Sequence, residues 1–313
     1  MVLQNRISRL LLMLILVTTV RTSLFAGSPP GDSEELSNLT YHSTVSEVRL
    51  VFFATDEHNH TVEALKPDDF AVVDDETVIR NFRSFTRSRE IKLDVIVLFD
   101  SSESVLPHFK HEMTEVLQLI SQSPWSPEDN ISVLSFSGME IHPVCAGDCH
   151  TLTAERLASS PRGGSTPLFD ALDTAASLLG RRRQPDVWPV IILFSDGDDT
   201  ISKSSFPDAV EKVVASGAQV YAIDLGNPGR PSRGSAILQR LASDSGGRCI
   251  RINEGAVRIF TDVIDDLHSA RVVTYALPPS RSDFHSVRIL PTHNLNLQFR
   301  SRVGYYRHAA SVQ

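Results

Sequence analysis

The alternation of apolar and polar positions divides the chain into a central region and two flanks. Between Lys92 and about Ala270, continuous apolar runs alternate with segments whose apolar residues recur at helical spacing. This alternation predicts a mostly parallel sheet covered by helices on both faces. The expected strands are residues 93–99, 131–136, 189–195, 219–225 and 247–252. The expected helices are residues 103–122, 151–159, 167–180, 205–216, 234–244 and 254–269.

The two flanks show strand patterns separated by polar turns. The expected strands are residues 45–54, 70–75, 78–82, 272–277, 286–290 and 295–300, and residues 302–306 follow the last of them. Each flank, 44–90 and 271–307, is small for an independent hydrophobic core. We therefore predict an α/β fold class. A doubly wound, mostly parallel, Rossmann-like sheet in residues 91–270 is inserted between flanks that pair into one small β-sandwich.

The first 26 residues have the pattern of a secretory signal peptide. Arg6 and Arg9 precede an apolar run at 10–17, and a small residue, Ala26, follows shortly after it. We expect an exported protein, periplasmic or secreted, with an uncleaved N-terminal anchor as the alternative. Residues 27–43 are expected to form a flexible leader, and residues 308–313 a tail. No later segment is long and apolar enough to predict a membrane span.

The charge balance limits the kinds of partner. The chain has 30 basic and 38 acidic residues, and residues 1–26 contain three Arg and no acidic residue, so the remainder carries a net charge of −11. Nucleic acid and anionic membranes are poor partners for such a chain. A hydrophobic content of 41% is ordinary for a globular protein, so we expect a sizeable core.

The three cysteines fall into two groups. Cys145 and Cys149 enclose a short polar loop, and in an exported protein we expect them to form a local disulfide. The alternative is a pair of free thiols; a zinc site would need a second ligand pair. Cys249 lies on an expected strand, where we interpret it as a small core residue.

Polar side chains gather where two apolar strands end. Asp100, Ser102 and Ser104 follow the strand at 93–99, and Asp196 follows the strand at 189–195. Thr166 lies in a Gly-rich turn at 163–168. Ligands of open α/β sheets bind at the carboxyl ends of the strands, so these oxygens are expected to converge there. Hydroxyl and carboxylate oxygens select a hard cation, here Mg²⁺, or else Mn²⁺ or Ca²⁺.

Each of these residues also has a purely structural interpretation when taken singly. Ser102 or Ser104 could cap the next helix, and Thr166 before Pro167 fits a helix N-cap. Asp196 with the following glycine could form only a turn. Further acidic residues nearby are interpreted as solvated or structural groups: Asp198 and Asp199 in a turn, and Asp94, Asp170 and Asp173 on strands or helices.

Taken together, the D-x-S-x-S sequence, the Thr in a Gly-rich loop and the strand ending in Asp-Gly resemble the metal-ion-dependent adhesion site (MIDAS) of von Willebrand factor type A (VWA) domains. The resemblance implies that five residues coordinate the metal, some directly and some through water: Asp100, Ser102, Ser104, Thr166 and Asp196. It also implies a coordination position that a carboxylate from another molecule can take.

From about residue 44 to 307, the chain resembles an exported bacterial family, the VWFA-related proteins first defined in Acidobacteria. The segments that carry the resemblance are 65–75, 79–82, the D-x-S-x-S strand, 195–200 and 302–305. Two positions depart from the family pattern: Glu103 replaces a small residue, and Val105 replaces a Met. Glu103 adds a negative charge beside the metal loop, which would either raise cation affinity or repel an acidic partner.

We expect a non-enzymatic protein that binds the Asp or Glu of a protein ligand through the metal. The first alternative is a structural or assembly protein whose metal only stabilises the fold. The second is a metal-dependent hydrolase. Hydrolases with a nucleophilic Asp need a second Asp where Ser102 stands, and the segment around Ser165 lacks G-x-S-x-G. His108 and His111 lack an evident acid–base partner.

Overall fold

The computed structural model describes residues 47–307, except 89–90, 123–124, 148, 150, 228, 231, 252–255 and 281. The expected signal peptide, the leader, residues 44–46 and the tail lie outside the described residues. Within this part of the chain, no helix is both long enough and apolar enough to cross a membrane.

The central region forms a six-stranded sheet in the order β10-β9-β8-β5-β6-β7. Its strands are β5 (Lys92–Asp100), β6 (Asn130–Ser137), β7 (Glu140–Cys145), β8 (Val187–Ser195), β9 (Gln219–Asp224) and β10 (Arg248–Arg251). All neighbouring pairs are parallel except β6 with β7. The middle strand β5 is buried from Asp94 onwards, which agrees with its nearly continuous apolar sequence.

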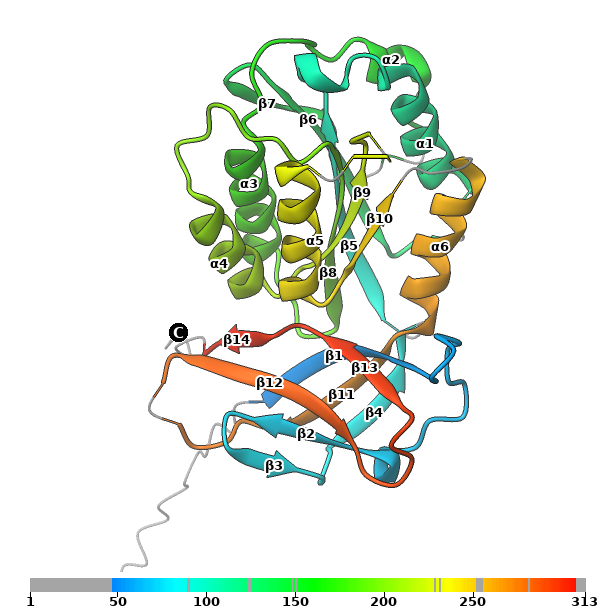
Figure 1. The fold of residues 1–313 in the computed structure, drawn as a ribbon, viewed down its shortest axis with the longest axis vertical. Helices are drawn as coiled ribbons and strands as arrows, with labels where there is room; N and C mark the ends of the chain where they lie inside the picture. The colour runs from blue at the N-terminus through cyan, green and yellow to red at the C-terminus, as the bar shows by residue number, and fades with distance from the viewer. Residues whose placement is uncertain are drawn as a thin grey trace, which may run out of the picture. The chain divides into compact units, whose positions relative to one another are not determined.

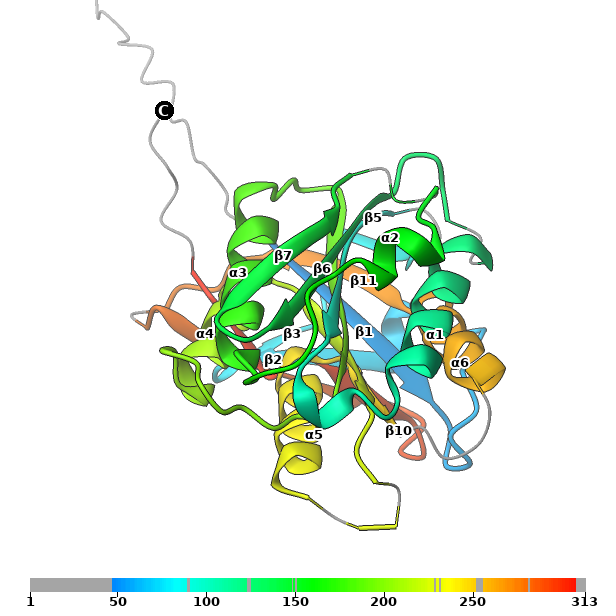
Figure 2. The same ribbon diagram turned by 90° about the horizontal axis from the view of Figure 1, so that it is seen from above.

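Helices cover both faces of this sheet. They are α1 (Phe109–Gln122), α2 (Ala154–Ala158), α3 (Leu168–Arg181), α4 (Phe206–Ser216), α5 (Arg233–Ser245) and α6 (Ala256–Ser269). In Figure 1, α3, α4 and α5 lie on the left of the sheet and α1 and α6 on the right, and Figure 2 shows the same division from above. The sheet is therefore doubly wound, as the sequence predicts.

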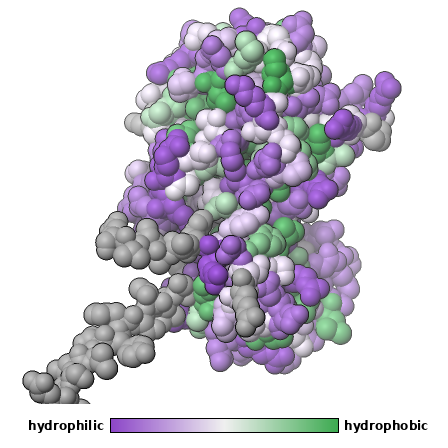
Figure 3. Space-filling model, turned by 90° about the vertical axis from the view of Figure 1, so that its left-hand side faces the viewer, coloured by the Kyte–Doolittle hydropathy of each residue, from purple (hydrophilic) through white to green (hydrophobic). Residues whose placement is uncertain are grey.

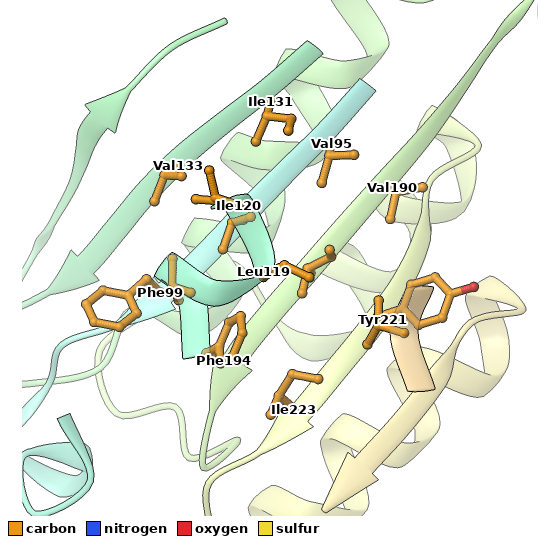
Figure 4. Packing of buried hydrophobic residues seen from close by; sticks show 14 of the residues in the cluster. Val95, Phe99, Leu119, Ile120, Ile131, Val133, Val190, Phe194, Tyr221 and Ile223 are labelled. Carbon is orange, nitrogen blue, oxygen red and sulfur yellow. The ribbon is translucent and has the colours of Figure 1, made fainter. Parts of the chain in front are cut away.

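Alternate residues of β5 supply the two cores. Val95, Val97 and Phe99 pack toward α1 and α6, whereas Ile96 and Leu98 pack toward α3, α4 and α5. Figure 4 shows the first of these cores, in which Leu119 and Ile120 of α1 lie over the apolar side chains of β5, β6, β8 and β9. Burial on both faces leaves β5 almost no freedom to shift its register.

The flanks form two four-stranded antiparallel sheets, β13-β1-β11-β4 and β14-β12-β2-β3. Their strands are β1 (Glu47–Thr55), β2 (Phe70–Asp74), β3 (Thr77–Ile79), β4 (Ser84–Arg87), β11 (Arg271–Ala276), β12 (Phe284–Pro291), β13 (Gln298–Ser301) and β14 (Gly304–Tyr306), and a short 3-10 helix, Pro67–Asp69, precedes β2. Each sheet pairs strands from both flanks: β1 with β11, and β2 with β12. Phe52 and Phe70 of opposite sheets share one core, with ring centroids 4.9 Å apart.

Arg300 of β13 joins the sandwich to the α/β region. Its guanidinium donates to both carboxylate oxygens of Asp266 in α6, at 2.7 and 2.6 Å. It also donates to the carbonyls of Gly246 and Gly247, at 2.7 and 2.8 Å, and lies 3.8 Å from the ring centroid of Phe53. One guanidinium nitrogen donates to both oxygens of Asp266 and another donates to both carbonyls, so this side chain links β13 to α6 and to the turn after α5.

The expected fold class is confirmed, with local differences. The helix expected at 103–122 begins only at Phe109, after a short 3-10 turn, Glu103–Val105. Pro107 has no backbone N–H, so a continuous helix through this segment would lose a hydrogen bond. The strands β4 and β7 were not expected; β7 runs into Cys145, so the first cysteine ends a strand rather than opening a polar loop.

Figure 3 shows how the hydrophobic residues are distributed over one face of the molecule. The face in Figure 3 is mostly hydrophilic, and its hydrophobic residues form small separate groups rather than one continuous area. Large continuous apolar patches are typical of protein or membrane docking surfaces. This face therefore has no apolar surface of that kind among the residues that the figure colours.

Glu115 of α1 makes stability depend on pH. Its side chain is 2% exposed, its Oε1 atom has no hydrogen-bond partner among the described residues, and His111 Nε2 lies 3.9 Å away. Burial raises the pKa of Glu115 from 4.5 to about 7. The folded state therefore holds this proton more tightly than the unfolded state. This contribution destabilises the fold progressively as the pH rises from about 4.5 to about 7.

We predict that Glu115→Gln raises the free energy of unfolding by about 3 kcal/mol at pH 8 and changes it little at pH 4. Urea denaturation of both proteins at the two pH values measures the difference. Glu57→Gln, at an exposed glutamate, controls for the loss of one negative charge. Equal effects of Glu115→Gln at pH 4 and pH 8 would contradict the assignment.

Candidate functional site

Asp100, the last residue of β5, is fully buried. Its Oδ1 accepts a hydrogen bond from the backbone N–H of Ser102 at 3.0 Å, and its Oδ2 accepts one from the Ser195 hydroxyl at 2.6 Å. The first bond orders the loop that follows β5, and the second ties that loop to the end of the neighbouring strand β8. The carboxylate is thus fixed in position by its own backbone and by the adjacent strand.

The two serines of D-x-S-x-S lie together beside Asp100. Their hydroxyl oxygens are 3.3 Å apart. Ser102 is fully buried, whereas Ser104 is exposed. The pair therefore extends from the buried carboxylate to the surface of the molecule.

Main-chain hydrogen bonds bring the Gly-rich loop against the same site. Gly163 N–H donates to the Ser101 carbonyl at 2.7 Å, and Glu103 N–H donates to the Gly164 carbonyl at 3.0 Å. Both glycines have positive φ, 84° and 77°, which other residues rarely adopt. The loop thus runs along the D-x-S-x-S segment.

The loop after β8 also holds Thr166, through two hydrogen bonds with Thr200. The Thr166 N–H donates to the Thr200 hydroxyl at 2.8 Å, and the Thr166 carbonyl accepts from Thr200 N–H at 3.0 Å. Among the described residues, the Thr166 hydroxyl makes no hydrogen bond with Asp100 or Asp196. The backbone nevertheless places this buried threonine between the loops that carry the two carboxylates.

Asp196, half-buried, begins the loop after β8. Its Oδ1 accepts from Asp198 N–H at 3.1 Å, and the Ser195 hydroxyl accepts from Gly197 N–H at 3.0 Å. Ser195 thus bonds to both loops at once. Sequence reasoning did not assign a role to this residue; its position directly before Asp196 is the only signal that pointed to it.

The electrostatics favour a cation at this point. Burial, together with the smaller effect of the nearby Asp196 charge, raises the pKa of Asp100 to about 6 against the opposing effect of its hydrogen bonds from Ser102 and Ser195. In the described part of the chain, no ion pair involves either carboxylate. Two carboxylates and three hydroxyls in this setting match the oxygen ligands of Mg²⁺ or a related cation.

Other acidic residues have structural roles. Asp199 accepts hydrogen bonds from Phe169 N–H at 3.3 Å and from the Ser202 hydroxyl, so it is not simply a solvated turn residue as expected. Asp170 accepts from the backbone N–H groups of Lys203 and Ser204, at 3.0 and 2.9 Å. These bonds fasten the start of α3 to the loop between β8 and α4, which steadies the Thr166 loop as well.

A second acidic cluster lies inside the β-sandwich, at the end of the strand predicted for residues 70–75, where the sequence indicates no cluster. Asp74, Asp75 and His285 present ligand atoms within 4.8 Å of one another. The oxygens of Asp74 accept from His285 Nδ1 at 2.8 Å and from the hydroxyls of Tyr275 and Tyr305, at 2.8 and 2.6 Å. Hydrogen bonds within the protein therefore satisfy this buried carboxylate, and we assign it to stabilisation of the sandwich.

The cysteines agree with the expected pairing. Cys145 and Cys149 form a disulfide with Cα atoms 5.8 Å apart. Cys249, on β10, is half-buried and free, and it packs against the core beside α3, α4 and α5.

Comparison with known proteins identifies the same protein family that the sequence motifs resemble. The profile of the von Willebrand factor type A domain matches residues 94–265. This stretch is more than half of the chain, and the protein belongs to the VWA-domain family. No curated protein matches the sequence.

Solved structures of similar fold include proximal thread matrix protein 1 from mussel byssus, at 18% identity and a TM-score of 0.45. The match covers 59% of this chain and 49% of the mussel protein, so this chain spans about half of that protein's length. Another structure of the mussel protein is described as having a zinc-occupied MIDAS motif.

Two microbial proteins are also similar. An aerotolerance-related membrane protein from Bacteroides fragilis has 19% identity and a TM-score of 0.43, with 56% of this chain and 99% of that chain covered. The ArnB paralog VWA2 from Sulfolobus acidocaldarius has 16% identity and a TM-score of 0.43, with 85% and 76% covered.

Gly197 and Gly234 set the position of the Asp196 loop against α5. A Cβ at Gly197, whose φ is +80°, would lie 2.2 Å from the Gly234 carbonyl oxygen. We predict that Gly197→Ala lowers the free energy of unfolding by about 3 kcal/mol, from backbone strain and steric overlap together.

Gly138→Ala is the matched control, because Gly138 also has positive φ, +64°, but has no atom within 4 Å of an added Cβ. It isolates the backbone strain, and we expect a loss of only about 1 kcal/mol. Chemical denaturation measures both variants. A Gly197→Ala protein as stable as Gly138→Ala would show that the close contact with α5 is unimportant.

Proposed function

We propose that this protein binds a divalent cation at its MIDAS-like site and, through that cation, an acidic side chain of a partner protein. The observation that carries the proposal is the setting of Asp100. Its carboxylate is fully buried, lies near the charge of Asp196, and has no ion-pair partner among the described residues. A bound cation would offset the cost of keeping this carboxylate ionised.

The ligand set consists of Asp100, Ser102, Ser104, Thr166 and Asp196. The two carboxylates among the five residues balance the charge of a divalent cation without exceeding it, and a cation that keeps a bound water can exchange that water for a partner's carboxylate. Ser195 and the Ser102 N–H hold Asp100 in a fixed orientation. Ser104 and Asp196, which retain exposed surface, define the side from which a partner approaches.

We infer that the site binds rather than catalyses. In the described hydrogen-bond network, no His or Cys contacts either carboxylate or any of the three hydroxyls, so the hydroxyls lack the imidazole neighbour that most often activates a hydroxyl nucleophile. Export to the periplasm or medium belongs to the same proposal. The Cys145–Cys149 disulfide supports it, because disulfides persist in oxidising compartments.

Metal titration tests the site. We predict that isothermal calorimetry with Mg²⁺ and Mn²⁺ shows one binding site in the wild type. Asp100→Asn should weaken binding at least about 100-fold, since loss of even an outer-sphere partner costs 10- to 100-fold. Ser104→Ala should weaken it roughly tenfold while leaving the fold intact, because Ser104 is exposed.

Asp198→Asn provides the control for loss of charge beside the site, since Asp198 is exposed and lies outside the proposed ligand set. We expect it to change the affinity by less than about threefold, as a screened neighbouring charge does. Equal metal binding in wild type, Asp100→Asn and Ser104→Ala would overturn the proposal.

A second experiment separates partner binding from simple stabilisation. The wild-type protein is used as bait on native envelope or medium, with parallel Mg²⁺ and EDTA washes, and its melting temperature is measured under both conditions. We predict a partner that EDTA releases and that Ser104→Ala fails to retain. A partner that stays bound in EDTA while the melting temperature falls would support the structural role instead.

A further inference from the structure

A cavity of about 470 Å³ lies where the strands of the α/β sheet begin, against the sandwich sheet that contains β1 and β11. Its wall includes Trp188 and Gln219, near the amino ends of β8 and β9, and Arg49 of β1. The proposed metal site lies at the other end of β8, at Ser195 and Asp196. Ligand cavities in proteins typically measure 300–1,000 Å³.

Three arginines surround this cavity: Arg49, Arg183 and Arg302. The same three also line an adjacent hollow of about 390 Å³. Glu47 is the one acidic residue in either wall, and its carboxylate pairs with Arg83. The cavity therefore has an excess of positive charge in a chain whose overall charge is negative.

Polar atoms in the wall lack partners. Trp188 is 1% exposed and Gln219 is 3% exposed, yet among the described residues the donor Nε1 of Trp188 and the acceptor Oε1 of Gln219 have no hydrogen-bond partner. The Nε of Arg302 is also unpartnered, although its NH2 donates to the Arg49 carbonyl at 2.9 Å. Unsatisfied buried donors are costly, so a group that accepts hydrogen bonds here would stabilise the fold.

The arginines are held at an electrostatic cost. Burial, together with the nearby charge of Arg183, lowers the pKa of Arg302 to about 10, although Tyr275, Tyr305 and Asp74 act in the opposite direction. Burial also lowers the pKa of Arg49. An anion in the cavity would offset this cost and would accept from the guanidinium and indole N–H groups.

We propose that this cavity binds a small organic anion, with its carboxylate or phosphate group facing the arginines and its apolar body packed beside Trp188. Val51 and Pro189 supply further apolar wall. Arg49 is partly occupied by the carbonyls of Pro185 and Val187, whereas Arg302 retains the unpartnered Nε. The principal contact to the anion therefore comes from the Nε of Arg302, and Arg183 at the rim adds positive charge. This proposal stands independently of metal binding at the MIDAS-like site.

Trp188 offers a direct reporter. The chain has two tryptophans, so Trp125→Phe leaves Trp188 as the one indole. We titrate this protein with phenyl phosphate and with phenylacetate, and with benzyl alcohol as the neutral counterpart. The expected result is a saturable change in Trp188 fluorescence with at least one of the anions, together with a rise in melting temperature. Benzyl alcohol should bind at least tenfold more weakly.

The variants Arg183→Gln and Arg302→Gln test the arginines. Arg183 is exposed at the rim, so its replacement should preserve the fold and weaken anion binding roughly tenfold or more. Arg181→Gln is the matched control, since Arg181 is an exposed arginine that does not line the cavity. It should leave the affinity unchanged. If Arg302→Gln does not fold, the Arg183 and Arg181 pair still decides the question.

Three results would overturn the proposal: no saturable fluorescence change with either anion, equal binding of benzyl alcohol, or equal affinities of Arg183→Gln and Arg181→Gln. Any of these would mean that water alone fills the cavity or that binding occurs elsewhere.

Discussion

The parallel pairing of β5 with β8 is the constraint from which the candidate site follows. Their register aligns Leu98 with Leu193 and Phe99 with Phe194, so Asp100 and Ser195 come next to each other at the strand ends. Both strands are buried on both faces, and a shift of one residue would exchange the side chains that the two cores accept. Apolar packing far from the site thus determines where its oxygens lie.

Much of this arrangement could be predicted from the sequence because the signals are local. The apolar run before Asp100 marks a buried strand, and the Gly-rich turn marks a loop that needs positive φ. The start of α1 was predicted too early because apolar residues continue at helical spacing across Pro107. That spacing favoured a continuous helix although Pro107 has no backbone N–H to donate. The strand β7 was missed because its six residues are mostly only half-buried or exposed.

Features that depend on distant residues could not be predicted in the same way. Ser195 reaches Asp100 only because β5 and β8 pair in this register, and no local sequence pattern reveals that register. In the sequence, Asp74 is only a polar residue near the end of a short strand, and its role appears when β12 brings His285 beside it. The arginine-lined cavity likewise joins side chains from β1, from the segment before β8 and from the segment before β14. In each case tertiary packing, rather than local sequence, creates the environment.

The pairing of β4 with β11 has a consequence for how the molecule is made. Arg87 and Arg271 are register partners, so the α/β region leaves the sandwich and returns to it at adjacent positions on one sheet. During synthesis, β1 and β2 emerge well before β11 and β12, their partners. β2 can pair with the adjacent β3 as soon as both are made, whereas β1 and the other edge of β2 lack these partners until the α/β region has been synthesised. The adjacent attachment points also make the α/β region a separable module in evolution, since a short linker could bridge the gap that its removal would leave.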